Sequence, residues 1–570
     1  MAIQIRNLLS ELRRRKVYRV AAVYIVVGLG ILGAAEVILD PLGLTGVRAY
    51  VVIFVLLGFP IALVLAWAYE VRPEGPVSES ERSEADGKLA EAVDAGAIPI
   101  PASPSMDLQS IAVLPFDSMS SDPEGDYFAD GITEELTNAL AKQKGLRVAA
   151  RTSAFAFKNQ PVDIREIGKT LEVSHVIEGS VRRTDEALRI TAQLINTTDG
   201  YHVWSEQFDR SHGDVFRIQE EIAGSVVQKL LGELPEDRRP VIATADLSAY
   251  DSYLKGRHAI AQFHPATLQE GVEHFETAIE MDSRFAPALA GLAEALTMQS
   301  IGFSTRPGLE VMPRAEKAAS RALELDPSLP EAHLARALAY MYGQWDYPAA
   351  KEEMDRALAL NPNSAEAHFW AEFYWTYIRH DFENAIAANR RAVELSPLDS
   401  RIRGRFATVN YLFGELKTAE EVLREELAEN PNHPLPHVSM ADTLVRMGRF
   451  DEAIPHSEEA ARLGGRAHAF LGMLAGFYGL AGNQAAAASL LEELEDRQRA
   501  SYTPGFWMAV AYGGAGRIDD AFAALERAVV EKDSNLLYLF FSPRAAGMHD
   551  DPRFDDILRR IGLEHLLQYK

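Results

Sequence analysis

The chain has 570 residues, which is too long for one compact core and predicts three or four structural units. Its formal net charge of −25 would repel phosphate backbones, which argues against a general nucleic-acid-binding function and leaves no nucleic acid among the expected partners. The absence of cysteine excludes disulfides, thiolate metal sites and cysteine nucleophiles.

Two apolar stretches come first in the chain, over residues 20–39 and 49–69. Each is about 20 residues long, the length with which a helix crosses the hydrocarbon core of a bilayer. The short, turn-rich connector over 40–46 predicts that they form a transmembrane helical hairpin within an N-terminal unit of residues 1–70. Lys and Arg cluster before the first span and after the second, so the positive-inside rule places both chain ends in the cytoplasm.

This membrane hypothesis has an alternative and a corollary. A signal peptide cleaved near Ala35 would account for the first stretch, although the second would still anchor the chain. Gly30 and Ala34 have the small-xxx-small spacing that permits close helix packing, which makes the spans a route to homo-oligomers. The lipid bilayer is thus an expected partner.

Residues 71–107 break the apolar pattern. Five prolines punctuate a stretch rich in Glu, Ser, Ala and Gly. Such a segment cannot bury enough apolar surface to fold by itself, so it predicts a flexible linker.

Regular patterns resume after the linker and predict a small α/β (α+β) domain over residues 108–235. A short apolar run closed by a proline predicts a buried strand, amphipathic stripes predict helices, and three strand-like runs follow at hairpin spacing. Asp130 stands where the N-cap of the first helix is expected. The predicted order is β-α-β-α-β-β-β-α, with strands at 110–116, 146–151, 176–183, 188–195 and 202–208 and helices at 132–142, 164–171 and 215–231.

Several runs in this domain carry a family resemblance. They are SIAVLPF at 110–116, YFADGITEEL at 127–136, RTS at 151–153, EGSVR at 178–182 and WSE at 204–206. With these runs the domain resembles the TolB amino-terminal/FlgO-like domain. In that family the domain stands between a membrane segment or a signalling module and tetratricopeptide repeats, and some relatives carry an adenylate cyclase. Together with the charge pattern, the resemblance predicts a two-pass protein of the bacterial inner (cytoplasmic) membrane whose soluble part is cytoplasmic. It implies no catalytic residues.

The rest of the chain is periodic. Helix-ending prolines recur at intervals of 35, 35 and 34 residues, at Pro327, Pro362, Pro397 and Pro431. A period near 34 is that of tetratricopeptide repeats, and small residues stand in register on the second helices, at Ala350, Ala385, Ala419 and Ala453. We expect an α-solenoid of about eight helix pairs over 245–545 and a capping helix over 546–570. The predicted fold class is therefore mainly α: a transmembrane helical hairpin, a small α/β (α+β) domain and an α-solenoid of tetratricopeptide repeats.

A solenoid of this kind presents a concave groove, which binds extended segments or helices of protein partners. Trp370, Tyr374 and Tyr377 lie in one first helix and are candidate anchors, with packing between helices as the alternative for each. Arg401 and Arg405 belong to a local basic patch that would suit an acidic partner segment, with a solvated face as the alternative.

No catalytic or cofactor motif emerges from the sequence. The run at 167–170 is similar to the end of a phosphate-binding loop, but Asp163 stands where the first glycine is required. His433 and His437 are separated by a stretch with two prolines, which argues against a shared metal site. We therefore predict no enzyme, no cofactor and no metal.

The predicted function is a membrane-anchored protein-interaction scaffold in bacterial signalling or regulation, which recruits its partners through the concave repeat surface. A non-catalytic regulatory subunit or relative of an adenylate cyclase system is one alternative. A cell-envelope assembly factor is another, but it would need the soluble part outside the cytoplasm, which the charge pattern opposes.

Overall fold

The structure is a computed structural model that describes residues 109–119, 125–183, 188–210, 215–232, 246–262, 264–301 and 305–570. The predicted spans at 20–39 and 49–69 and the linker at 71–107 lie outside these residues. Within the described ranges no helix is both long and apolar enough to cross a membrane. The longest of them, α12 (Gly308–Leu325), has 18 residues and carries six charged side chains. We therefore correct the prediction of a membrane-spanning fold class and a two-pass inner-membrane location: the described chain is mainly helical, with a helical solenoid.

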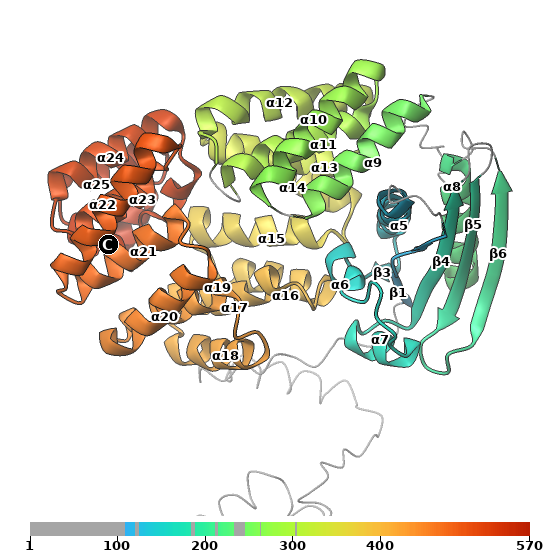
Figure 1. Ribbon diagram of the computed structural model, residues 1–570, viewed down its shortest axis with the longest axis horizontal. Coiled ribbons are helices and arrows are strands. Elements are labelled where there is room, and N and C mark those ends of the chain that lie inside the picture. Colours follow the sequence, from blue (N-terminus) through green and yellow to red (C-terminus); the bar gives the residue numbers. More distant parts are fainter. Residues whose placement is uncertain are drawn as a thin grey trace, which may run out of the picture. The chain divides into compact units, whose positions relative to one another are not determined.

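The α/β domain is built on one mixed sheet with the strand order β3-β1-β4-β5-β6. Strand β1 lies between β3 and β4 and pairs in parallel with both, whereas β4, β5 and β6 form an antiparallel meander. Parallel strands that are neighbours in a sheet must be joined by a crossover connection. Helices provide it here, because along the chain one helix follows β1 before β3, and two more follow β3 before β4 (Figure 1). The strands are β1 (Gln109–Val113), β2 (Asp117–Ser118, paired with β4), β3 (Leu146–Val148), β4 (His175–Arg183), β5 (Leu188–Asn196) and β6 (His202–Arg210), and the helices are α5 (Gly125–Ala141), α6 (Arg151–Phe155), α7 (Ile164–Thr170) and α8 (Val215–Leu231).

The two faces of the sheet are buried to different extents. Alternate residues of β5 are buried from Leu188 to Leu194, and they join the core that includes Ile132 of α5 and Ile218 of α8. A second, smaller core on the other face lies under α7 and includes Ile167. Strand β6 is exposed at most of its positions, so the sheet is covered on both faces only near β1 and β4.

The predicted strands of the meander and the helices at 164–171 and 215–231 are confirmed to within two residues at each end. Three predictions in this domain are wrong. The first strand ends at Val113 and not at residue 116. The first helix begins at Gly125 and not after Asp130, so Asp130 lies inside α5, where it is buried. The second strand ends at Val148, because the chain turns into the short helix α6 at Arg151.

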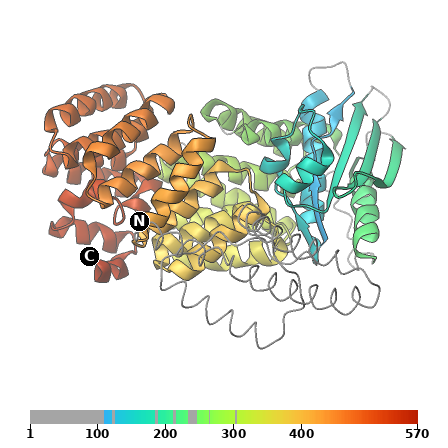
Figure 2. The ribbon, with the colours of Figure 1, turned by 90° about the horizontal axis from the view of Figure 1, so that it is seen from below.

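Among the described residues after 245, sixteen α-helices stack as eight consecutive pairs, which follow one another from green to red in Figures 1 and 2. In two pairs the first helix is prolonged by a π-helical turn, η2 (Ala339–Gln344) or η3 (Tyr374–Arg379). The pairs are α9 (Leu247–Ala261) with α10 (Pro265–Met281), α11 (Ala286–Ile301) with α12, α13 (Pro330–Leu338) with α14 (Tyr347–Leu360), α15 (Ala365–Phe373) with α16 (Phe382–Leu395), α17 (Ser400–Leu412) with α18 (Leu416–Glu429), α19 (Pro434–Arg446) with α20 (Phe450–Leu463), α21 (His468–Leu480) with α22 (Gln484–Ala500), and α23 (Gly505–Gly514) with α24 (Ile518–Glu531).

Small residues and proline turns explain the register of these pairs. The four in-register alanines predicted from the sequence are fully buried, because a larger side chain would push neighbouring helices apart. In three repeats the Nε2–H group of a first-helix histidine donates to the carbonyl of the turn proline six residues earlier, at 3.0 to 3.1 Å: His333 to Pro327, His368 to Pro362 and His437 to Pro431. Each bond satisfies a carbonyl near the end of a helix that would otherwise lack a donor. The fourth turn, at Pro397, has Arg403 in the histidine position.

Two adjacent glycines of α23 allow a direct test of this packing. A Cβ on Gly514 would lie 2.3 Å from the carbonyl oxygen of Ala475 in α21, whereas a Cβ on Gly513 would meet only Met548, at 3.7 Å. We expect Gly514→Ala to lower the free energy of unfolding by about 2 kcal/mol, because backbone atoms cannot make room for it. Gly513→Ala should leave it unchanged or raise it by up to about 1 kcal/mol, since alanine favours a helix. Urea unfolding followed by circular dichroism measures both, and equal effects would contradict the packing.

Candidate functional site: the domain joint and the inner surface of the repeats

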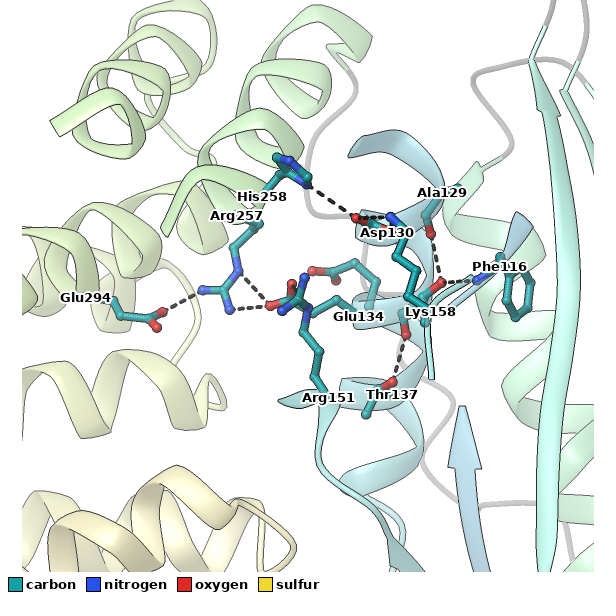
Figure 3. A network of polar contacts seen from close by, with 12 residues as sticks. Phe116, Ala129, Asp130, Glu134, Thr137, Arg151, Lys158, Arg257, His258 and Glu294 are labelled. Atoms are coloured by element: carbon teal, nitrogen blue, oxygen red, sulfur yellow. Dashed lines mark hydrogen bonds and ion pairs between the residues drawn. The ribbon is translucent and has the colours of Figure 1, made fainter. Parts of the chain in front are cut away.

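The α/β domain meets the repeats through buried ion pairs. Glu134 of α5 is 5% exposed and accepts hydrogen bonds from the guanidinium of Arg257 in α9, with Nε at 2.9 Å. Arg151 of α6 reaches the other carboxylate oxygen of Glu134 at 3.1 Å. Arg257 also contacts Glu294 of α11 at 2.5 Å, so it lies between two carboxylates, as Figure 3 shows. One arginine therefore connects the sheet domain to the first two repeats.

A second carboxylate of α5 extends this network. Asp130 accepts from Lys158 at 2.6 Å and lies 3.4 Å from Nδ1 of His258 in α9 (Figure 3). Burial alone would raise the pKa of Asp130, but the hydrogen bonds from His258 and Lys158 outweigh it and lower the pKa. Burial would also raise the pKa of Glu134, but the positive charges of Arg257 and Arg151 outweigh this effect and lower the pKa. Both groups are therefore held as carboxylates.

Two tyrosine–carboxylate pairs flank the ion pairs. The Tyr127 hydroxyl donates to Asp251 at 2.7 Å, and Arg183 also contacts that carboxylate at 2.7 Å. The Tyr253 hydroxyl donates to Glu135 at 2.7 Å. Burial raises the pKa of Glu135, whereas the pKa of its neighbour Glu134 is lowered. Each pair links one residue of the sheet domain with one of α9.

Backbone contacts fix the domain at a second place on the repeats. The Ala150 amide donates to the carbonyl of Leu395 at 2.7 Å, and the Asn363 side chain donates to the carbonyls of Ala141 and Leu146 at 3.0 and 2.8 Å. Leu398 packs against the smaller core of the sheet domain. The domain thus contacts α9 through charges and the turns before α15 and α17 through hydrogen bonds to backbone carbonyls, which define one orientation.

The aromatic residues predicted as partner anchors are buried. Trp370 donates its indole N–H to Glu366 at 2.9 Å, and Tyr374 packs edge-on against Trp375. Tyr377 is 4% exposed. Packing between helices, the alternative given above, accounts for these ring surfaces, and a partner-binding role for them stays a prediction.

The predicted basic patch is a set of ion pairs. Arg401 contacts Asp399 at 2.9 Å and Glu366 at 3.2 Å. Arg405 donates to both oxygens of the fully buried Glu372 at 2.7 Å. Nearby carboxylates thus balance both charges, and binding of an acidic partner segment by these arginines stays a prediction.

A segment that no sequence pattern predicted lies on the inner surface of the repeats. Residues 532–549, which we call the C-terminal strap, contain the 3-10 helices η4 (Ser534–Tyr538) and η5 (Pro543–Met548). Helix η4 contacts α11, η3 and α23, and η5 contacts α19, α21 and α23. All of these belong to the first helices of their pairs. The run LLYLFF at 536–541 was the available signal, but its apolar character is also typical of an ordinary repeat helix.

The strap contacts repeats from both halves of the array. The Ser534 hydroxyl donates to the carbonyl of Ser300 at 3.0 Å, and Arg446 donates to that of Phe541 at 2.6 Å. The Lys532 ammonium lies 3.4 Å from the ring centre of Trp345. After the strap the chain enters α25 (Pro552–Arg560), and the last turn η6 (Glu564–Tyr569) ends it.

The described residues show no group of three or more His, Asp or Glu side chains that could hold a metal ion. The closest pair of imidazoles is His437 with His456, whose Nδ1 atoms are 2.9 Å apart. One Nδ1 atom of this pair donates and the other accepts, and Nε2 of His437 donates to the carbonyl of Pro431. This pair is therefore satisfied as a hydrogen bond between helices α19 and α20.

Comparison with known proteins matches both parts of the chain. Residues 438–502 match a tetratricopeptide repeat model. The chain contains tetratricopeptide repeats. Residues 107–225 match a model described as the HilA/YgeH-like transcriptional regulator, second domain. This model differs from the TolB amino-terminal/FlgO-like domain that the residues resemble, so that assignment stays a prediction.

One relative and several solved structures are similar to parts of the chain. "Putative adenylate cyclase 3" of Rhizobium meliloti (strain 1021) is 40% identical over 243 residues, which span 42% of this chain and 40% of that protein. Yeast Tom70 is 16% identical with a TM-score of 0.37 and coverage of 61% and 77%. PilF of Pseudomonas aeruginosa is 23% identical with a TM-score of 0.28 and coverage of 37% and 93%. The assignment of the repeats rests on the matched repeat model and on the helix pairs themselves.

The joint predicts a large effect for one substitution. Arg257→Met would leave two carboxylates in the joint without their shared cation, so we expect it to lower the free energy of unfolding by about 3 kcal/mol. The matched control is Arg499→Met, whose ion pair with Asp496 is exposed on both sides and should contribute less than about 0.5 kcal/mol. Urea unfolding measures both variants. If the two arginines contributed equally, the joint would not depend on its buried charges.

The same network predicts a pH dependence. A carboxylate whose pKa is lowered on folding stabilises the fold above its unfolded pKa, and this contribution is lost as the pH falls through the folded pKa. For Asp130 and Glu134 the contribution is therefore present at pH 6 and lost below about pH 4. Lys158→Met should make the loss of unfolding free energy between pH 6 and pH 3.5 smaller by on the order of 1 kcal/mol.

Lys144→Met is the control for this measurement, because Lys144 is exposed and the substitution makes the same change in net charge. Glu135 has a raised pKa, so it changes the pH dependence of stability in the opposite direction. Because Glu135 is present in both variants, its contribution cancels in the comparison. Parallel pH profiles of the two variants would show that Lys158 does not stabilise the ionised form of Asp130.

Proposed function

We propose that this chain is a non-catalytic protein-interaction scaffold of a bacterial signalling or regulatory system. The repeats bind a protein partner, and the α/β domain holds the first repeats in one geometry. The observation that carries this proposal is the array of eight helix pairs, to which a second domain is joined by buried ion pairs and backbone hydrogen bonds. Tetratricopeptide repeats point to protein binding, and a fixed joint makes one binding unit of the two parts.

The names of the matched proteins support a regulatory setting. The α/β domain matches part of a transcriptional-regulator family, and the 40% identical relative is named as an adenylate cyclase. Transcriptional regulation and cyclic AMP synthesis are chemically different outputs, whereas a protein-binding module can serve either of them. The TolB amino-terminal/FlgO-like resemblance agrees with this interpretation, because that domain also stands beside repeats in signalling proteins.

The second candidate function is an adenylate cyclase, which is favoured by the name of the relative. The chain spans 40% of the length of that protein, so the activity of the whole relative is not transferred by the match. The two candidates differ in one measurable respect, since a cyclase converts ATP to cyclic AMP without a partner.

A single preparation of the full-length chain separates the two candidates. With ATP and Mg²⁺ or Mn²⁺ we expect no cyclic AMP above the protein-free blank. The immobilised chain should retain a protein from an extract of its source cells, and that protein, once purified, should bind with a Kd of about 10 µM or tighter. Heat-unfolded chain is the control for both steps. Cyclic AMP formed in proportion to the chain would overturn the non-catalytic proposal, and a retained protein that no longer binds once purified would overturn the scaffold.

A further inference from the structure

The C-terminal strap occupies the surface that an array of helix pairs offers to a partner. The main contacts of η4 and η5 with the described repeats are made with first helices of the pairs, or with the π-turn that prolongs one. First helices of neighbouring pairs pack against one another, as α11 does with α13 and α21 with α23, and the surface that these first helices form is what we call the inner surface. The strap therefore lies where an incoming segment would lie.

The chemistry of this contact is apolar and aromatic. Leu536, Leu537 and Leu539 are almost completely buried. The ring of Tyr538 packs edge-on against Tyr377 with their centres 4.9 Å apart, and Phe541 packs against the same ring at 5.5 Å. The surface thus recognises leucine and aromatic side chains presented by short helical turns.

The strap can leave this surface without unravelling the array. It connects α24 to α25, and α25 packs back on α24, where Arg560 contacts Glu526 at 2.8 Å. Its backbone hydrogen bonds are mostly local, as between Leu539 and Leu536 or Ser542 and Tyr538. Connections between paired helices are usually short, and long ones without regular structure are usually functional lids or binding loops.

The strap also leaves polar groups of the inner surface unused. The hydroxyl of Tyr342 in η2 is buried with its residue 1% exposed, and it has no hydrogen-bond partner among the described residues. Thr503 Oγ1, in the turn before α23, also lacks one among the described residues. Buried polar groups are normally paired, so these atoms are available to the backbone of another segment.

We propose that the C-terminal strap is an intrachain ligand of the inner surface, which a partner segment rich in leucine and aromatic residues displaces. The inference rests on the proposed function and states how its binding surface is regulated. A segment tethered in this way has an effective concentration in the millimolar range, so it keeps out weak competitors and yields to a partner that also uses the unpaired polar groups.

The absence of cysteine from the chain allows a clean test of this proposal. In the full-length chain, the double variant Ser300→Cys/Ser534→Cys puts two cysteines at positions that touch, because the Ser534 hydroxyl now reaches the carbonyl of Ser300, and oxidation is used to join them. Leu536→Asp instead weakens the hold of the strap, because the fully buried leucine becomes charged. The probe is a fluorescent peptide with the sequence of residues 533–543, and the same peptide with Leu536→Asp is its control.

Fluorescence anisotropy should show the peptide bound at least about tenfold more tightly to the Leu536→Asp chain than to the wild type. The oxidised double variant should not bind it, and reduction should restore the wild-type level. Equal binding by all three chains, or equal binding of the control peptide, would overturn the proposal.

Hydrogen exchange of the wild-type chain provides a second measurement, should Leu536→Asp fail to fold. Amides of residues 534–548 should exchange at least about tenfold faster than those of α19 and α23, because the strap opens locally. Exchange of the strap only together with those helices would identify it as permanent core and overturn the proposal. Neither measurement uses a partner protein, so a failure here is distinct from a failure of the scaffold proposal.

Discussion

The buried carboxylate of Glu134 is the contact on which the arrangement of the two parts depends. A carboxylate removed from water is unfavourable unless cations and hydrogen bonds replace the water, and here Arg257 and Arg151 do so from two different elements. Sliding the α/β domain along the repeats would separate at least one of these pairs. The network therefore contributes less to net stability than to the choice of one orientation, because every other orientation leaves a charge unpaired.

The structure of the repeats, in contrast, is determined by a local sequence pattern. The proline turns and the buried alanines recur once in each repeat, so a period in the sequence was sufficient to predict them. The alternation of Leu188, Ile190, Ala192 and Leu194 likewise predicted β5. The prediction failed where a residue's partner is distant in the sequence. Asp130 was predicted at a helix cap but lies inside the helix, where Lys158 and His258 compensate its charge.

In the candidate site, too, the features that depend on distant partners could not be predicted from local sequence. Tyr377 was predicted to be on the inner surface from its place in a first helix, but its neighbour there is Tyr538 of the same chain, 161 positions further on (538 − 377). A run of leucine and aromatic residues at 536–541 does not reveal whether it packs as a repeat helix or crosses to another repeat. Arg405 could not be distinguished from a partner-binding arginine for the same reason, because Glu372 neutralises it only once the two repeats are stacked.

Helix α11 connects the joint to the strap. Its Glu294 contacts Arg257 in the joint, and the carbonyl of its Ser300, near the C-terminal end of the same helix, accepts from Ser534 of the strap. Both contacts lie on one continuous helix, so a shift of this helix would change both of them. Since a coupling free energy is reciprocal, a partner that displaces the strap and a ligand or domain that shifts the joint would each alter the affinity for the other. The two features that local sequence could not reveal thus lie on a single rigid element, which gives the α/β domain a physical means to influence what the repeats bind.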